Sequence, residues 1–188
     1  MPYTNNLIIA LLYLDKYIEY KITNNIKTYL PSNNYMKIST ARVQDIPNLC
    51  MLLNILFEQE KEFTPDEKAQ IKGLNTIIET PEIGEIFVAR DEENVIGMVN
   101  LLYTISTALG GKVAILEDMV VDKYARGKGV GSVLIDHVIN HAKEKGCKRI
   151  TLLTDVDNTS AQKFYILGQK ICHLKTQRIF LVFKKLAK

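Results

Sequence analysis

Cysteine is scarce in this chain and follows no pattern. The 188 residues contain three cysteines, Cys50, Cys147 and Cys172, an odd number without any CxxC spacing. A disulfide framework or a zinc knuckle requires cysteines in pairs or at metal-binding intervals. The sequence predicts neither, and we expect the three thiols to pack as small apolar groups.

A long apolar run is also missing. The early run Leu7–Leu14 is closed by Asp15 and Lys16 and has no positive charge before it. It is too short to span a bilayer, and no small-residue cleavage site follows it as in a signal peptide. We therefore expect a cytoplasmic protein with no membrane partner.

Neither sign of charge dominates. Lys and Arg number 24 against 21 Asp and Glu, which gives a formal net charge of +3. A protein that binds by neutralising many phosphates carries a far higher density of positive charge. No nucleic-acid partner is expected, and the 47% apolar content is instead that of an ordinary domain with one hydrophobic core.

Glycine is absent from the beginning of the chain, where Gly73 is the first. Residues 1–35 contain six of the nine tyrosines and six asparagines. Apolar residues at spacings of three and four predict an amphipathic helix over Asn6–Tyr20, and Pro31 lies in the segment that breaks it. We interpret residues 1–35 as an N-terminal extension, helical or loosely ordered, and residues 36–188 as the functional domain. The helix would lie on the domain or on a partner chain, so a homodimer is left open.

Strand and helix patterns follow in mixed order from Met36. Apolar runs bounded by turn residues predict strands over residues 36–42, 85–90, 95–103, 113–121, 149–154, 170–174 and 178–183. Helical spacing predicts helices over residues 45–59, 64–78, 130–145 and 158–167. Thr64-Pro65-Asp66-Glu67 indicates a capping box with proline at the first helical position. These elements predict an α+β fold, a mixed sheet with helices on both faces.

A glycine-rich turn joins the strand at 113–121 to the helix at 130–145. It reads Arg126-Gly127-Lys128-Gly129-Val130-Gly131-Ser132. Glycines let a ligand approach the backbone, and the free N–H groups at a helix start favour an anion. The turn therefore indicates a phosphate site, the alternative being a tight connection without a ligand. Because Ser132 follows Gly131 directly, neither a P-loop nor a GxGxxG fingerprint is present.

The same turn resembles the Arg/Gln-x-x-Gly-x-Gly/Ala signature of the GCN5-related N-acetyltransferase (GNAT) family. A second segment resembles that family's Asn-x-x-Ala…Phe-Tyr…Gly pattern, through Asn158, Ala161, Phe164, Tyr165 and Gly168. The resemblance covers about residues 36–184, and both motifs occur in the expected order. It departs at Gln169, where the family usually has phenylalanine after Leu-Gly.

Membership of this family implies a mixed, mostly antiparallel sheet that splays between its fourth and fifth strands and holds acetyl-CoA there as co-substrate. The pantetheine arm would pair with the backbone of Met119, Val120 and Val121. The remaining implied cofactor-binding residues are Arg126, Gly127, Lys128, Gly129, Val130, Gly131, Ser132 and Asn158. The implied reaction moves an acetyl group to a primary amine by direct attack in a ternary complex, and the acceptor would be a small molecule or a peptide.

Two residues are the predicted catalytic groups. Tyr165 occupies the family position of the acid that protonates the leaving thiolate, and a phenol with a pKa near about 10 can do so for a thiol near about 8.5. By spacing alone it could equally be a core aromatic. Glu117 resembles the acidic residue that precedes the same loop, and we predict it as the base, directly or through water. Neighbours on a strand face opposite ways, so at most one of Glu117 and Asp118 would line the cleft directly. Asp118 stays open as the base, and so does the alternative that both are structural charges near a strand bulge or groups that position a cationic substrate.

Other interpretations are less favoured. His137 and His141 have the spacing of a helical zinc site, but Val138 stands where that pattern has glutamate, so no metal is expected. A catalytically weak acyl-CoA-binding or sensing module is the alternative function, because it would need the glycine turn but neither Tyr165 nor Glu117. An enzyme that acetylates aminoacyl-tRNA is disfavoured by the modest net charge.

Overall fold

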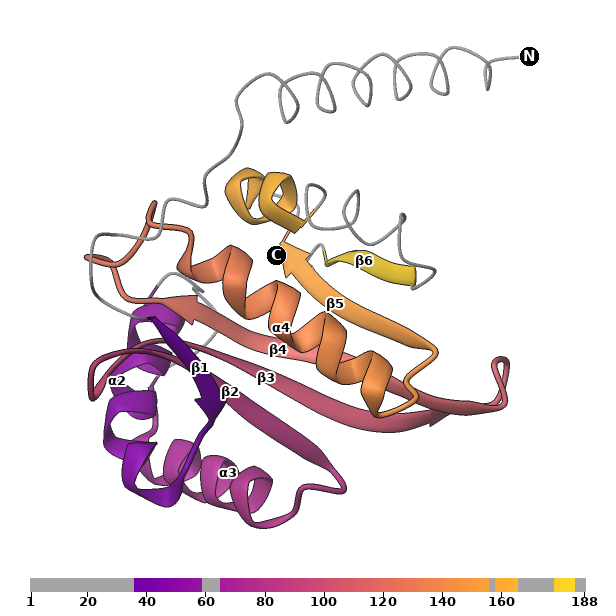
Figure 1. Cartoon of the computed structure of the whole chain (residues 1–188), viewed down its shortest axis with the longest axis horizontal. Coiled ribbons are helices and arrows are strands. Elements are labelled where there is room, and N and C mark those ends of the chain that lie inside the picture. Colours follow the sequence, from indigo (N-terminus) through magenta and orange to yellow (C-terminus); the bar gives the residue numbers. More distant parts are fainter. Residues whose placement is uncertain (1–35, 59–64, 156–157, 166–177, 185–188) are drawn as a thin grey trace. The chain divides into compact units, whose positions relative to one another are not determined.

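The computed structural model describes residues 36–58, 65–155, 158–165 and 178–184. Within them one sheet has six strands that lie in sequence order (Figure 1). The strands are β1 (Lys37–Thr40), β2 (Gly84–Asp91), β3 (Asn94–Ser106), β4 (Gly111–Val121), β5 (Arg149–Asp155) and β6 (Arg178–Lys184). The neighbours from β1 to β4 are antiparallel, and β4, β5 and β6 are parallel. The predicted mixed, mostly antiparallel sheet is confirmed.

Helices account for most of the remaining described chain. They are the 3-10 turn η1 (Val43–Asp45), α2 (Ile46–Phe57), α3 (Glu67–Glu79) and α4 (Val130–Glu144), and residues 159–165 are also helical. None of these helices combines the length and apolarity that a membrane crossing needs. The predicted strand at 170–174 and the predicted helix over Asn6–Tyr20 of the N-terminal extension lie outside the described residues.

Helix α3 begins later than the capping-box pattern predicts. Asp66 is its N-cap, and the Asp66 carboxylate accepts a hydrogen bond from the Ala69 N–H at 3.1 Å. Pro65 therefore precedes the helix instead of occupying its first position. The aspartate side chain reaches the third helical N–H, and that bond decides where the helix starts.

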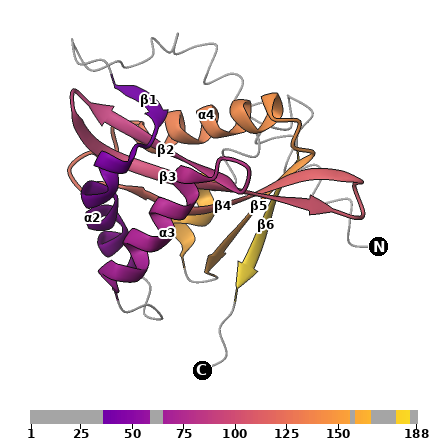
Figure 2. The ribbon, with the colours of Figure 1, turned by 90° about the horizontal axis from the view of Figure 1, so that it is seen from below.

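Two hydrophobic cores lie on opposite faces of the sheet. Helix α4 covers one face, where Leu134 and Val138 pack against Phe87, Leu101 and other strand residues. Helices α2 and α3 cover the other face, as Figure 2 shows. Because alternate residues of β2 and β3 enter the two cores, both faces are buried, and the predicted arrangement of helices on both faces is confirmed.

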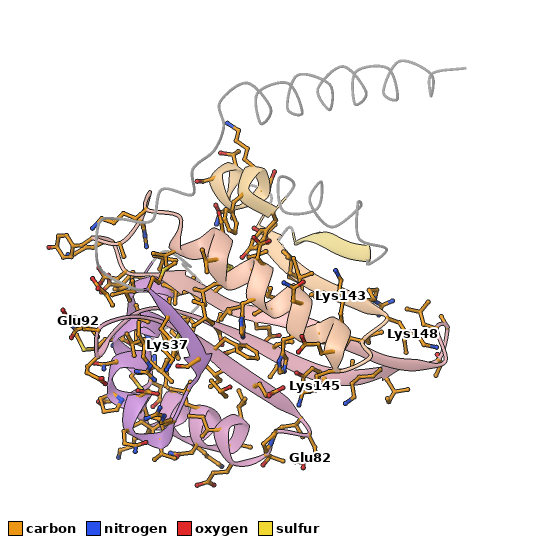
Figure 3. The ribbon with its side chains drawn as sticks, in the orientation of Figure 1. Lys37, Glu82, Glu92, Lys143, Lys145 and Lys148 are labelled. Carbon is orange, nitrogen blue, oxygen red and sulfur yellow. The ribbon has the colours of Figure 1, made fainter. Side chains whose placement is uncertain are left out.

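The far end of α4 shows the stop signals that its sequence contains. Lys143 and Lys145, labelled in Figure 3, lie in and just after its last turn. Gly146 follows with a φ of 72°, a conformation that favours glycine. Cations near the last carbonyl groups complement the helix dipole, so both composition and geometry end the helix here.

Candidate functional site

Strands β4 and β5 run together only briefly. Their paired residues extend from Ala114 with Ile150 to Leu116 with Leu152. Strand β4 continues to Val121 and β5 to Asp155 without further pairing between them. The sheet therefore splays between its fourth and fifth strands, as predicted. The predicted pantetheine-binding residues Met119, Val120 and Val121 lie on β4 beyond the point where the strands part.

A β-bulge interrupts β4 at the same place. Asn100 of β3 lies opposite Glu117, and Met98 lies opposite Val120, so two residues of β4 face one residue of β3 between these pairs. Asp118 is the first of the two and has a φ of 46°, in the left-handed region that non-glycine residues rarely adopt. An extra residue in this conformation bends the strand and redirects a side chain.

The bulge breaks the simple alternation of side chains along β4 and so decides which of Glu117 and Asp118 lines the cavity. Before it, Leu116 packs in the core on the α4 side, and after it Met119 packs on that same side although it is three residues further on. The side chains therefore switch faces of the sheet at Asp118. Its side chain lines a cavity on the α2 and α3 side of the sheet, whereas regular alternation would have placed it with Leu116.

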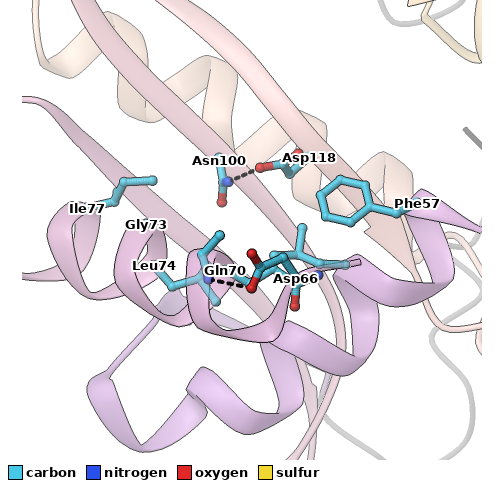
Figure 4. Close-up of a pocket in the computed structure, with 10 residues that line it drawn as sticks. Phe57, Asp66, Gln70, Gly73, Leu74, Ile77, Asn100 and Asp118 are labelled. Carbon is cyan, nitrogen blue, oxygen red and sulfur yellow. Dashed lines mark hydrogen bonds between the residues drawn. The ribbon is translucent and has the colours of Figure 1, made fainter. Parts of the chain in front are cut away.

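The cavity beside Asp118 has a volume of about 300 Å³ and lies between α2, α3 and the sheet (Figure 4). We call it the acceptor cavity, after the role proposed for it below. Its apolar lining is Leu53, Phe57, Ala69, Gly73, Leu74 and Ile77. Its polar lining is Asp66, Gln70, Asn100 and Asp118. The volume is at the lower end of the range for small-molecule sites.

Burial sets the protonation behaviour of Asp118. Removal from water, with the negative charge of neighbouring Glu117 adding to it, raises the pKa of Asp118 to about 6. The Asn100 amide, which donates to the carboxylate over 2.6 Å, offsets part of this rise. A carboxyl group with a pKa near neutrality in a cavity is the kind of group that can accept a proton during a reaction.

Glu117 is placed differently. Its side chain is exposed and is not part of the acceptor-cavity lining, although its position opposite Asn100 puts it close to the bulge. Its role as base stays a prediction. The sequence patterns did not identify Asn100 and Gln70, although Asn100 is a lone amide within the apolar run of residues 95–103, a signal that could have identified it.

The glycine turn has the conformation that its sequence predicts. Gly127 and Gly129 have φ values of 74° and 81°, and Gly129 is the N-cap of α4 without any side-chain cap. The first turn of α4 contains no acidic residue. Its N–H groups have no intrahelical acceptors, so together with the helix dipole they favour an anion. Lys128 and Ser132 are exposed beside them.

Arg126 and Val130 hold this turn against the rest of the domain, Arg126 by a hydrogen bond and Val130 by burial. The Arg126 Nε donates to the Val121 carbonyl over 3.0 Å, which ties the turn back to the end of β4. Val130 is buried under the start of α4. The structure thus brings the predicted pyrophosphate-binding residues together at one helix start, next to the predicted pantetheine strand.

The helix at residues 159–165 lies against the same turn. A Cβ added to Gly131 would lie 3.3 Å from the Phe164 ring, so glycine permits this close packing. Tyr165 packs against the α4-side core, with its ring centroid 5.3 Å from that of Phe164. Asn158 begins this helix, and its Oδ1 accepts a hydrogen bond from the Ala161 N–H at 3.0 Å. That bond explains Asn158 as a cap, and its contact with a cofactor stays a prediction.

The histidines of α4 belong to a separate cluster. His141 Nε2 lies 2.7 Å from the Glu85 carboxylate, and both His137 and His141 pack against the Phe87 ring. No group of three or more potential metal ligands occurs among the residues that the structure describes. Cys50 and Cys147 are buried, and Cys172 lies outside the described part of the chain.

A sheet that splays at a bulge, beside a glycine turn and an uncapped helix start, is the arrangement expected of the acetyltransferase family that the sequence resembles. Residues 49–168 match the model of the Acetyltransferase (GNAT) family, and the chain belongs to this family. The uncharacterized N-acetyltransferase YhfO of Bacillus subtilis is 29% identical over 133 residues, covering 69% of this chain and 86% of that protein.

Two further comparisons extend this result. Glucosamine 6-phosphate N-acetyltransferase of Arabidopsis thaliana is 38% identical over 48 residues, which cover 26% of this chain and 32% of that enzyme. The structure of a predicted acetyltransferase from Clostridium acetobutylicum with acetyl-CoA has a TM-score of 0.59 and 18% identity, covering 70% of this chain and 88% of that one. At that identity the structural match concerns the fold.

Proposed function

We propose that this protein transfers the acetyl group of acetyl-CoA to a primary amine by direct attack in a ternary complex. The observation that carries the proposal is the position of Asp118, at the bulge where β4 leaves β5. There its carboxyl group lines the acceptor cavity, and Asp118 directly precedes Met119, the first of the β4 residues predicted to pair with pantetheine. An amine in the cavity would lie next to the proposed thioester position.

The glycine turn fits the pyrophosphate of acetyl-CoA. Gly127 and Gly129 keep backbone N–H groups accessible, since nothing lies within 4 Å of a Cβ built at either position. Arg126 and Lys128 add positive charge beside a helix start without a capping side chain. We assign pyrophosphate binding to residues 126–132, and pantetheine pairing to the backbone of Met119, Val120 and Val121.

Acetyl-CoA supplies an acetyl group activated as a thioester. In the transfer the amine nitrogen forms a bond to the carbonyl carbon, the carbon–sulfur bond breaks, and an ammonium substrate loses two protons. We assign acceptance of the amine proton to Asp118, with Glu117 as the alternative predicted from sequence. The Tyr165 hydroxyl would protonate the departing thiolate and be restored by the second proton from nitrogen. The backbone N–H near Val120 would donate to the developing oxyanion.

The test combines ligand binding with turnover. Acetyl-CoA should raise the thermal midpoint of the full chain well above the effect of NAD or ATP at equal concentration, because only a ligand of the folded state stabilises it. Release of free CoA should then depend on an added primary amine. Equal stabilisation by all three ligands would remove the cofactor assignment.

The alternative is a catalytically weak acyl-CoA-binding or sensing module. It shares the glycine turn and predicts stabilisation by acetyl-CoA without amine-dependent CoA release. The Asp118→Asn and Tyr165→Phe variants separate the two functions. In an acetyltransferase they should lower amine-dependent CoA release, whereas a binding module would show no such release in the wild type and would keep its acetyl-CoA affinity in both variants.

A further inference from the structure

The acceptor cavity carries negative charge, and two of its lining residues, Asn100 and Gln70, each hold a buried amide oxygen without a hydrogen-bond partner. Asp66 and Asp118 contribute carboxylates, and none of the described residues that line it is Lys, Arg or His. An amine that also bears a phosphate or carboxylate near the reacting nitrogen would place that anion without a cationic partner, close to two carboxylates. The charge of the lining therefore opposes such acceptors.

The side-chain amide nitrogens of Asn100 and Gln70 each donate a hydrogen bond within the protein. Asn100 Nδ2 donates to Asp118 Oδ2 over 2.6 Å, and Gln70 Nε2 donates to Asn54 Oδ1 over 2.9 Å. Asn100 Oδ1 and Gln70 Oε1 have no hydrogen-bond partner, although the two residues are only 2% and 8% exposed. In Figure 4 the Asn100 oxygen points away from Asp118. Buried acceptors without donors are rare and costly, so each of these oxygens calls for a donor.

An ammonium group satisfies all of these requirements together. It offers three N–H donors and a positive charge, and amide and carboxylate oxygens can only accept from it. The remaining walls are apolar, formed in part by Leu53, Phe57 and Leu74, and suit a chain of methylene groups. Exposed Asp66, at the start of α3, provides a second negative charge within the same lining.

We infer that the acceptor cavity selects a small aliphatic amine without an anionic group, and favours a diamine whose second ammonium pairs with Asp66. That the bound amine is an acetyl acceptor rests on the proposed acetyl transfer. The preference of the cavity for one amine over another is tested by binding measurements alone. The reacting nitrogen would lie beside the Asp118 carboxylate, next to the bulge, with the buried amides of Asn100 and Gln70 behind that surface.

Calorimetric titration of the full chain with three matched amines tests the selectivity. The probes are 1,5-diaminopentane, pentylamine and 5-aminopentanoate, which share one primary amine and chain length and differ at the far end. We expect the diamine to bind most tightly and 5-aminopentanoate at least about tenfold more weakly than pentylamine, since a tenfold change in affinity is the size of effect that one charge-assisted interaction produces. Binding of 5-aminopentanoate or glucosamine 6-phosphate as tight as that of pentylamine overturns the inference, as does failure of all three probes to bind.

Two variants assign the preference to residues. Gln70→Met keeps the length of the side chain but removes both the unpaired oxygen and the nitrogen that donates to Asn54, and should weaken all three probes. Asn75→Leu is the matched control, because Asn75 is an amide on the same helix that lies outside the cavity lining. Asp66→Asn retains a helix cap and should abolish only the advantage of the diamine over pentylamine. Equal effects of Gln70→Met and Asn75→Leu would show that the cavity oxygens do not bind the amine.

The inference and the proposed function fail in different ways. Tight binding of 1,5-diaminopentane without CoA release on addition of acetyl-CoA would remove the transfer reaction and leave the amine site intact. Efficient acetylation of an anionic amine in preference to 1,5-diaminopentane would leave the transferase intact and overturn the inferred acceptor class.

Discussion

Asn100 on β3 donates a hydrogen bond to Asp118 on β4 over 2.6 Å, at the bulge that interrupts the pairing of these two strands. The bond holds the carboxylate of a residue whose backbone has a positive φ, and it leaves the Asn100 oxygen unsatisfied. One hydrogen bond between neighbouring strands therefore determines both the orientation of a candidate base and the presence of an acceptor for an amine. The geometry links strand pairing directly to the proposed chemistry.

The raised pKa of Asp118 makes stability depend on pH. The folded chain holds this proton up to a pH of about 6, whereas an unfolded aspartate loses it near about 4. Because the folded state binds more protons in that window, the contribution of Asp118 to the free energy of unfolding should fall as pH rises from about 4 to 6, by about 3 kcal/mol at most. Asp118→Asn should flatten this dependence in urea unfolding measured at several pH values. An unchanged slope would mean that the carboxyl titrates normally.

Turnover as a function of pH distinguishes Asp118 from Glu117. If Asp118 is the base, Asp118→Asn should lower kcat by about 10²- to 10⁴-fold, and Glu117→Gln should only move the break in the profile to lower pH, since it removes a negative neighbour. If Glu117 is the base, Glu117→Gln should itself cause the large loss, with the loss shrinking at high pH where free amine is abundant. A loss in Glu117→Gln that is independent of pH would indicate positioning of the substrate.

The sequence predicted most of the fold because its elements have strong local signals. The continuous apolar run of β2, the helical spacing in α4 and the glycine conformation at Gly129 are each determined by a few adjacent residues. The bulge at Asp118 has only a weak signal, the two carboxylates that interrupt an apolar strand, because it arises from pairing with β3. It redirects the side chain of Asp118, the candidate base. The orphaned oxygens of Asn100 and Gln70 could not be predicted either, since they depend on which atoms surround them after folding.

Tyr165→Phe removes a hydroxyl group and keeps the ring that packs on the α4-side core. Loss of a general acid should lower kcat by about 10²- to 10⁴-fold while acetyl-CoA affinity stays nearly unchanged. Single-turnover kinetics and acetyl-CoA titration measure the two quantities separately. Full turnover in the variant would assign Tyr165 to packing alone.

Replacement of Gly129 tests the anion site, and Gly146 provides a matched control. Both glycines have positive φ, at 81° and 72°, and both have nothing within 4 Å of a built Cβ. Alanine at either position should cost a similar amount of stability, about 1–2 kcal/mol, because the strain is the same. Only Gly129→Ala should also weaken acetyl-CoA binding, since it crowds the N–H groups at the start of α4. Equal acetyl-CoA affinity in the two variants would mean that the glycine turn only connects β4 to α4 and does not bind acetyl-CoA.

Residues 1–35 are predicted to be dispensable for the acetyltransferase domain. The family match spans residues 49–168, and the first strand of the sheet begins at Lys37, so the described sheet needs no residue from the leader to start. The sequence predicts no tertiary anchoring for residues 1–35, so we expect their removal to cost little stability. Residues 36–188, expressed alone, should therefore keep the thermal midpoint within about 2 °C and the acetyl-CoA affinity within about twofold of the full chain. Sedimentation of both forms would show whether the apolar stripe of the leader supports a homodimer. A drop of several degrees, or insolubility of the shorter chain, would make the leader an integral part of the domain and move the predicted boundary.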